Sequence, residues 1–141
     1  MPKIKVLYLR AGVDEEPEII EIERDDVESK QRLIDCNTYD IVLRKIRDKD
    51  YFIICDDEGR LKENPIVSGL GDMIDIAFVG NLLICGVDVL ECGEIDLGSL
   101  TQEDVKKIKK EIVTYTRINK KTGERSKARA VLVSTGGRVI C

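Results

Sequence analysis

The stretch DIVLRKIRDKDYFIICDDEG, residues 40–59, holds two β-favouring runs with a polar segment between them. DIVLRKI (40–46) and YFIIC (51–55) are rich in the β-branched and aromatic residues that strands favour, and RDKD between them predicts a turn. In DDEG, Asp side chains can hydrogen-bond to nearby amides and Gly59 can adopt a positive φ, which predicts a second turn. The spacing of the acids does not match an EF-hand, so we interpret them as a turn and not as a metal site.

Similar β-favouring runs lie on both sides of this stretch. IKVLYLR (4–10) and PEIIEIE (17–23) predict a hairpin. MIDIAFVG (73–80) and NLLICGVDV (81–89) predict two core strands joined by a tight Gly-Asn turn. SGLG (68–71) contains a lone G-x-G without the third glycine and the helix of a dinucleotide site, so we expect a loop there.

Two segments predict helices. Asp25 or Asp26 can cap a short helix over residues 27–36, with Val27, Gln31 and Ile34 on one face. A longer amphipathic helix is expected over residues 102–113. Its N-cap is Thr101, and its apolar stripe consists of Val105, Ile108 and Ile112.

The C-terminal part alternates in a β manner around a polar loop. Residues 113–118 are expected to pair with residues 128–134, and Gly136-Gly137 can turn into a last short strand, RVIC. The predicted fold class is therefore α+β, a mostly antiparallel β-sheet with two helices and a C-terminal β-hairpin extension. We expect residues 1–112 to form a small domain and residues 113–141 to be a basic hairpin packed on it.

Composition narrows the function classes. The 141 residues are 43% hydrophobic, as in one ordinary globular domain. The five cysteines form no CxxC pair, so a disulfide framework is not expected. Histidine is absent, which removes Ser-His and Cys-His couples and every His-containing zinc site. We therefore expect no enzyme, no metal and no cofactor. No apolar run reaches the roughly 20 residues that cross a bilayer and no signal peptide is recognisable, so a cytoplasmic protein without membrane contact is expected.

Charge is unevenly placed along the chain. Residues 106–141 carry 11 cations and two acids, a net charge of +9, whereas residues 1–105 carry 12 cations and 25 acids, a net charge of −13. This asymmetry indicates either an anionic partner for the basic end or pairing between the two halves. Such pairing can occur within one chain or between chains, and in the second case we expect a homo-oligomer.

The candidate ligand-binding residues lie in the basic end. Arg117, Lys121, Arg125 and Arg129 place cations on the arms and tip of the expected hairpin, where they could contact phosphates. STGGR (134–138) could form an anion-binding nest, in which hydroxyl, amide and guanidinium groups converge. The nest residues are Ser134, Gly136, Gly137 and Arg138. A solvated charged hairpin and a plain Gly-Gly turn are the alternatives without a function.

The order of elements, with four stretches of sequence, resembles a known family. The stretches are KIKVLYLRAG with PEIIEIE, YFIICDDEGRLKENP, DIAFVGNLLICGVD and GEIDLGSLTQEDVKKI. They resemble the family called domain of unknown function 3846 over about residues 3–112. The resemblance implies an accessory protein of a phage, plasmid or other mobile genetic element, a setting in which counter-defence genes are common. It implies no catalytic residues.

From these observations we expect a non-enzymatic accessory protein that sequesters a small anionic, nucleotide-like ligand. Sequestration requires a concave site on which cations and backbone amides converge. Two alternatives stay open. The acidic part could inhibit a host protein by direct binding or by mimicry of nucleic acid. The basic hairpin could instead bind nucleic acid.

Overall fold

The computed structural model describes residues 3–10, 16–36, 38–56, 69–72, 75–118 and 121–133, and within these the segments 69–72, 75–79, 115–118 and 126–130 by their backbone. The expected turn after Asp56, the nest in STGGR and the strand RVIC lie outside the described residues.

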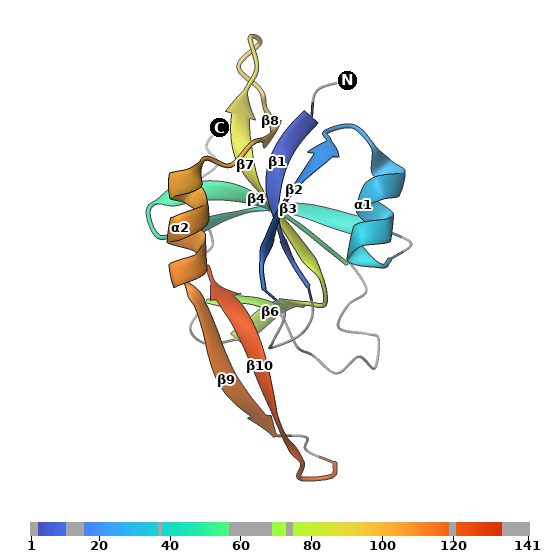
Figure 1. Ribbon diagram of the computed structural model, residues 1–141, viewed down its shortest axis with the longest axis vertical. Coiled ribbons are helices and arrows are strands. Elements are labelled where there is room, and N and C mark those ends of the chain that lie inside the picture. The colour runs from blue at the N-terminus through green and yellow to red at the C-terminus, as the bar shows by residue number, and fades with distance from the viewer. Residues whose placement is uncertain are drawn as a thin grey trace.

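The described residues form two sheets and two helices (Figure 1). The larger sheet has six strands in the order β2-β1-β7-β4-β3, with β8 paired to β7, and the smaller has the order β6-β5-β10-β9. Only the β5–β10 pairing is parallel among the described strands. The predicted class, α+β with a mostly antiparallel sheet and two helices, is confirmed. The elements are β1 (Lys3–Leu9), β2 (Glu18–Glu23), α1 (Val27–Ile34), β3 (Tyr39–Ile46), β4 (Lys49–Asp56), β5 (Gly69–Asp72), β6 (Asp75–Val79), β7 (Leu82–Val89), β8 (Ile95–Gly98), α2 (Gln102–Lys110), β9 (Ile112–Ile118) and β10 (Arg125–Leu132).

Both faces of the larger sheet are buried, because its central strands are apolar at successive positions. Leu7 and Leu9 of β1 pack with Ile108 of α2 in one cluster, which also contains residues of β10. Their neighbour Tyr8 faces the other way and packs with Ile34 of α1. Side chains alternate between the faces of a strand, so a continuous apolar run supplies both cores. The two helices consequently lie on opposite sides of the sheet (Figure 1).

The two hairpins expected in the first half are confirmed. Strand β1 pairs with β2, and β3 pairs with β4 through the register Ile46↔Lys49. The turn between β3 and β4 is tighter than the four polar residues RDKD indicated, since only Arg47 and Asp48 connect the two strands. Arg47 has a φ of 61°, in the left-handed region that two-residue hairpin turns require.

Helix α1 differs from its prediction in its buried face. Asp26 is the N-cap, accepting a hydrogen bond from Ser29 N at 3.2 Å. Val27 was expected on the packed face with Ile34, but it is 51% exposed. The helix instead buries Lys30 beside Ile34 and ends at residue 34, with Asp35 in the left-handed conformation.

Two predictions for residues 68–89 were wrong. The turn at Gly80-Asn81 does not join neighbouring strands, because β6 belongs to the smaller sheet and β7 to the centre of the larger one. Gly80 has a φ of 95°, which lets the chain pass from one sheet to the other. The expected loop in SGLG is also wrong, since Gly69–Asp72 is strand β5.

The last helix and hairpin have different boundaries from those predicted. Thr101 caps α2 as expected, but the helix ends at Lys110, and Ile112 begins β9. The β-branched run after Glu111 explains the early end, because such residues favour strands. The predicted pairing of 113–118 with 128–134 is correct as a hairpin, but its register runs from Arg125↔Ile118 to Val131↔Ile112. Neither helix in the described part of the chain has the length and hydrophobicity needed to cross a membrane.

Gly86 is expected to be required for the β7–β8 hairpin. A Cβ atom on Gly86 would lie 2.4 Å from the backbone oxygen of Ser99, too close for any carbon atom. We expect Gly86→Ala to lower the free energy of unfolding by about 2 kcal/mol, because backbone must move to admit the methyl group. Urea denaturation measures this, with Gly98→Ala as the control, since its nearest backbone atom lies at 3.0 Å. Equal losses in both variants would contradict the prediction.

Candidate functional site

The hairpin of β9 and β10, here called the ribbon, projects from the body of the molecule (Figure 1). Its base is part of the fold. Val131 and Val133 are buried in the cluster that contains α2, and Ala130 pairs with Gly69 of β5. The backbone N–H of Leu132 donates to the carbonyl of Glu111 at 2.9 Å. These contacts fix the direction of the ribbon. Its outer half carries Arg117, Lys121 and Arg125, whereas Arg129 lies nearer its base.

The structure locates the predicted ligand-binding residues only in part. Lys121 and Arg125 are exposed at the outer end of the ribbon. Arg117 pairs with Ser126, and Arg129 with Thr114. Because directly paired and alternate residues share a face, the register puts positions 125 and 129 on one face of the ribbon and position 117 on the other. The nest residues Ser134, Gly136, Gly137 and Arg138 lie outside the described residues.

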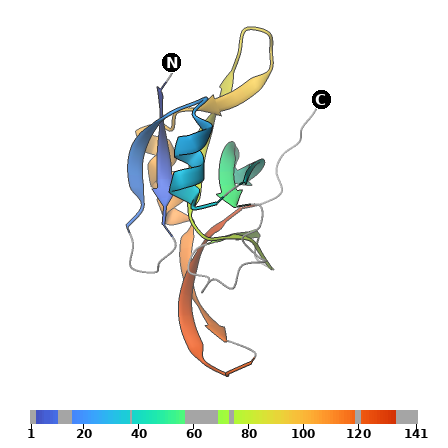
Figure 2. The same ribbon diagram turned by 90° about the vertical axis from the view of Figure 1, so that its right-hand side faces the viewer.

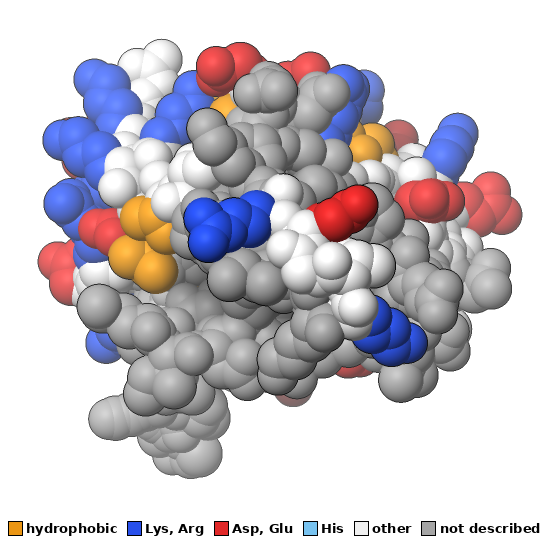
Figure 3. Space-filling model, turned by 90° about the horizontal axis from the view of Figure 1, so that it is seen from below, with side chains coloured by type: hydrophobic (Ala, Val, Ile, Leu, Met, Phe, Trp, Pro, Cys, Tyr) orange, Lys and Arg blue, Asp and Glu red, His pale blue; other side chains and the backbone are white. Residues whose placement is uncertain are grey.

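Helix α2 contributes cations that the predicted site did not include. Lys106, Lys109 and Lys110 are exposed, and only Glu111 separates the helix from the ribbon. No ion pair joins these three lysines to an acid in the described part of the chain. Figure 3 shows Lys and Arg side chains gathered on the side of the molecule where α2 lies. We call these lysines, together with Lys121 and Arg125, the basic surface.

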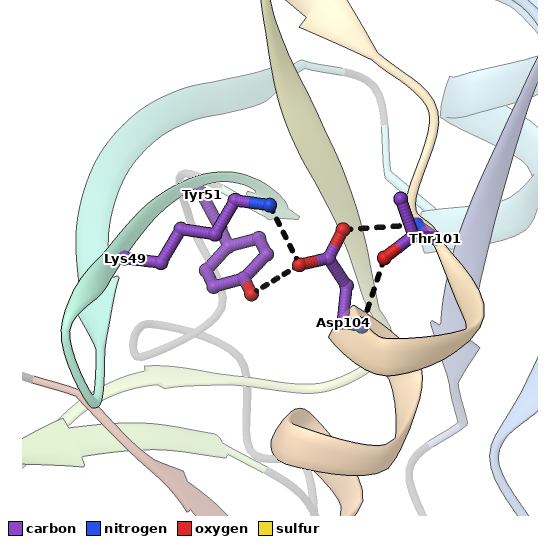
Figure 4. A network of polar contacts seen from close by, with 4 residues as sticks. All are labelled: Lys49, Tyr51, Thr101 and Asp104. Atoms are coloured by element: carbon purple, nitrogen blue, oxygen red, sulfur yellow. Dashed lines mark hydrogen bonds and ion pairs between the residues drawn. The ribbon is translucent and has the colours of Figure 1, made fainter.

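A buried polar network anchors α2 (Figure 4). Oδ1 of Asp104 accepts hydrogen bonds from Lys49 Nζ and from Tyr51 Oη, both at 2.8 Å. Oδ2 accepts from Thr101 N at 2.9 Å, while Asp104 N donates to Thr101 Oγ1 at 3.1 Å. This reciprocal pair is a capping box in which aspartate occupies the place of glutamate.

The network also fixes protonation states. Burial pushes the pKa of Asp104 upward, but hydrogen bonds from Lys49, Thr101 and Tyr51 outweigh burial and lower the pKa to about 2. The pKa of Tyr51 is raised, first by burial and then by its hydrogen bond to Asp104. The carboxylate thus stays ionised and the phenol stays protonated near neutral pH. With its side chain only 4% exposed, Asp104 holds α2 against β4.

A second buried group ties α1 to the sheet. The Nζ atom of Lys30 donates to the carbonyl of Arg24, and burial lowers the pKa of this lysine. Arg24 lies 3.7 Å from the carboxylate of Asp88 and 3.5 Å from that of Asp96, in the β7–β8 hairpin. Burial raises the pKa of the neighbouring Cys85 thiol to about 12. These groups pack and orient the fold.

A groove of about 590 Å³ lies between β2 and α1, away from the basic surface. Ile20 and Ile22 of β2 and Leu33 of α1 give it an apolar lining, with Glu21 and Glu23 among its charged residues. We call it the β2–α1 groove. Sequence reasoning missed it because two elements form it jointly and neither carries a motif.

Metal-binding and disulfide chemistry are not seen in the described residues. No three His, Cys, Asp or Glu side chains come together there as ligands. Cys36, Cys55, Cys85 and Cys92 are free thiols, with Cys55 and Cys85 buried. Cys55 of FIIC and Cys85 of LLIC belong to the two hydrophobic clusters, where they pack as small apolar residues.

The fold and these surfaces define a small, sheet-rich α+β protein with a basic surface and a separate groove. A family model described as "Domain of unknown function (DUF3846)" matches residues 4–113, and the chain belongs to this family. The predicted family resemblance is thereby confirmed. Comparisons with curated proteins and with solved structures found no match. The family match ends at the second residue of β9, so most of the ribbon lies beyond it.

Proposed function

We propose that this chain is a non-enzymatic binding protein that holds a phosphate-bearing partner on the basic surface. The observation that carries the proposal is the continuity of α2 with the ribbon. Exposed lysines of the helix lead directly into a projecting arm with further cations at its end. Lysine and arginine side chains on such a surface attract phosphates through charge that needs no sequence readout.

An extended nucleic acid strand fits this surface best. The described cations follow a helix and a protruding hairpin, so they match a row of phosphates rather than one compact ligand. The β2–α1 groove is lined by three acids, Glu21, Glu23 and Asp26, beside two cations, Lys3 and Arg32, and this balance does not favour an anion. Nucleic acid binding was the third expectation from sequence, and the geometry supports it more than sequestration by a single copy.

Sequestration of a small nucleotide remains the second candidate, for one structural reason. Strand β9 is the last strand of its sheet in the order β6-β5-β10-β9, so one edge of it is open to pairing within the described residues. Two copies joined through β9 would bring two ribbons together around a nucleotide. This candidate therefore requires a homo-oligomer that forms or tightens with the ligand.

The proposed setting comes from the family resemblance. It supports an accessory protein of a phage or mobile genetic element, acting in the host cytoplasm and serving counter-defence. A binding protein would act there by occupying a nucleic acid or by withdrawing a nucleotide signal. Neither activity requires catalytic residues on the chain.

The proposal predicts binding to a fluorescent 20-nucleotide single strand that weakens steeply with salt. If four phosphates are contacted, affinity should fall roughly 50-fold between 50 and 200 mM salt. Fluorescence anisotropy measures the affinity for the single strand. In parallel, binding to a panel of nucleotides is followed by thermal shift and by sedimentation. Nucleotide binding with dimer formation, and recovery of unchanged nucleotide after heating, would support the second candidate instead.

Failure to bind either class at low salt would contradict both proposals. The acidic residues 1–105 would then be the surface to test, as an inhibitor that contacts a host protein directly or mimics nucleic acid.

A further inference from the structure

We propose that the β2–α1 groove binds an extended peptide with alternating basic and apolar side chains, which adds to β2 as a further strand. This inference goes beyond the proposed nucleic acid function and uses a different surface of the molecule. It rests on an open strand edge, on a groove beside that edge and on the charges and apolar residues that flank it.

The first observation is the open edge of strand β2. Strand β2 ends the order β2-β1-β7-β4-β3, and among the described strands it pairs only with β1. Figure 2 shows β2 at the outer edge of the sheet, with α1 beside it. Alternate backbone N–H and C=O groups on an edge strand point outward and can bond to an added chain. A groove between an edge strand and a helix is a common place for such strand addition.

The inner neighbour of β2 shows which sequence fits beside it. In β1, Lys3 lies opposite Glu23 and Lys5 opposite Glu21, on one face of the sheet. At the positions between them, Ile4 lies opposite Ile22 and Val6 opposite Ile20, on the face that α1 covers. Basic residues thus pair with acids on one face, and apolar residues pair with apolar residues on the other.

A strand on the outer edge of β2 would meet the same two sets of side chains. Its apolar residues would enter the groove against Ile20, Ile22 and Leu33. Its basic residues would lie beside Glu21 and Glu23, and Ile19, which is 53% exposed, borders this face. The glutamates would repel an acidic strand and also the β2 edge of a second copy, so charge selects a basic partner.

The remaining charged groups of the groove do not reverse this preference. Asp26 is engaged by Ser29, whose backbone N–H donates at 3.2 Å and whose hydroxyl donates at 2.6 Å. The two cations of the groove are Arg32, which belongs to α1, and Lys3, which already lies opposite Glu23 in the register of β1 and β2. The occupant to which these features point is a lysine- or arginine-bearing extended segment of a partner protein.

The test uses the full chain with the fluorescent peptide KIKVKIK and the acidic control peptide EIEVEIE. We expect KIKVKIK to bind and EIEVEIE not to bind. Hydrogen exchange should show added protection of β2 amides upon binding, because strand addition satisfies outward N–H groups. Protection that appears in β9 instead, or in no strand, would overturn the proposal.

Charge reversal separates the groove from general attraction to an acidic protein. The double variant Glu21→Lys, Glu23→Lys should weaken KIKVKIK binding about tenfold, as expected for two exposed charge pairs turned from attraction to repulsion. The matched control reverses Glu91 and Glu94, which are exposed near the β7–β8 turn. Equal weakening of peptide binding in both variants would overturn the proposal. Protection of β2 amides that rises with protein concentration in the absence of peptide would also overturn it, because a second copy of the chain would then be the occupant.

This test does not depend on nucleic acid binding. The oligonucleotide affinity of the Glu21 and Glu23 variant should equal or slightly exceed that of the unmodified chain, since the change removes acids away from the basic surface. Loss of peptide binding with oligonucleotide binding retained would therefore separate the two sites.

Discussion

Replacing Asp104 by alanine is expected to lower the free energy of unfolding by about 3 kcal/mol. The substitution leaves the fully buried Tyr51 hydroxyl without its acceptor, a loss of about 1 to 3 kcal/mol. It also removes the capping box at Thr101, worth about 0.5 to 2 kcal/mol. Thermal and urea unfolding should both show the change, with a fall in the melting temperature of roughly 10 °C.

A double-mutant cycle distinguishes the network from simple loss of packing. Tyr51→Phe alone should cost less than Asp104→Ala, because Asp104 keeps its contacts with Lys49 and Thr101. In the Tyr51→Phe background no hydroxyl remains to be orphaned, so Asp104→Ala should cost about 1 to 2 kcal/mol less than it does alone. Strict additivity would show that the hydrogen bond between these side chains contributes little.

The same network predicts the sign of a pH effect. The folded-state pKa of Asp104 lies near 2, below the ordinary value of 3.8, so the unfolded state takes up the proton first as pH falls. The stabilisation is complete above about pH 5 and disappears progressively as pH falls through 3.8 toward 2. Across this range the unmodified chain should lose about 2 kcal/mol more than Asp104→Asn, which has no carboxylate to titrate.

Local features of the fold were predictable from sequence, whereas long-range pairings were not. The hairpins β1–β2, β3–β4 and β9–β10 and the caps at Asp26 and Thr101 depend on residues close in the sequence, and they were identified. The separation of β6 and β7 into different sheets depends on β5 pairing with β10, about 60 positions further along the chain. The run DIAFVGNLLIC looks like a simple hairpin because its pattern does not record which strands lie beside it.

For the candidate sites too, features of one segment were predictable from sequence and contacts between distant segments were not. Ribbon cations such as Arg125 could be proposed from charge and alternation, because both are properties of one segment. The lysines of α2 were counted in the charge of residues 106–141 but were not among the candidate site residues, so their continuity with the ribbon went unrecognised. The β2–α1 groove and the contact of Asp104 with Lys49 join elements distant in the chain, and no spacing in the sequence indicates them.

The largest functional effect is expected from removing three arginines of the ribbon. Arg117→Gln, Arg125→Gln and Arg129→Gln together should weaken binding to the single strand about 100-fold at 50 mM salt. The dependence of log affinity on log salt should flatten by about 1.4, as expected when two phosphate contacts to a single strand are lost. We expect the melting temperature to change little, with a shift in stability of about 0.5 kcal/mol for each substitution.

The register refines this expectation. Positions 125 and 129 share one face of the ribbon, and position 117 lies on the other. One strand of nucleic acid can follow one face, so the pair Arg125→Gln, Arg129→Gln should account for most of the loss, with little added by Arg117→Gln. Equal contributions from all three would indicate a ligand that surrounds the ribbon, as in the nucleotide-bound dimer.

The matched control removes the same charge from the larger sheet, through Lys3→Gln, Lys5→Gln and Lys45→Gln. It should retain nearly full binding if the position of the cations matters, and it should match the arginine variant if only net charge matters. An arginine variant that unfolds would identify these side chains as structural. One that folds and binds with undiminished affinity would remove these arginines from the site, because the phosphates would then lie on the lysines of the basic surface.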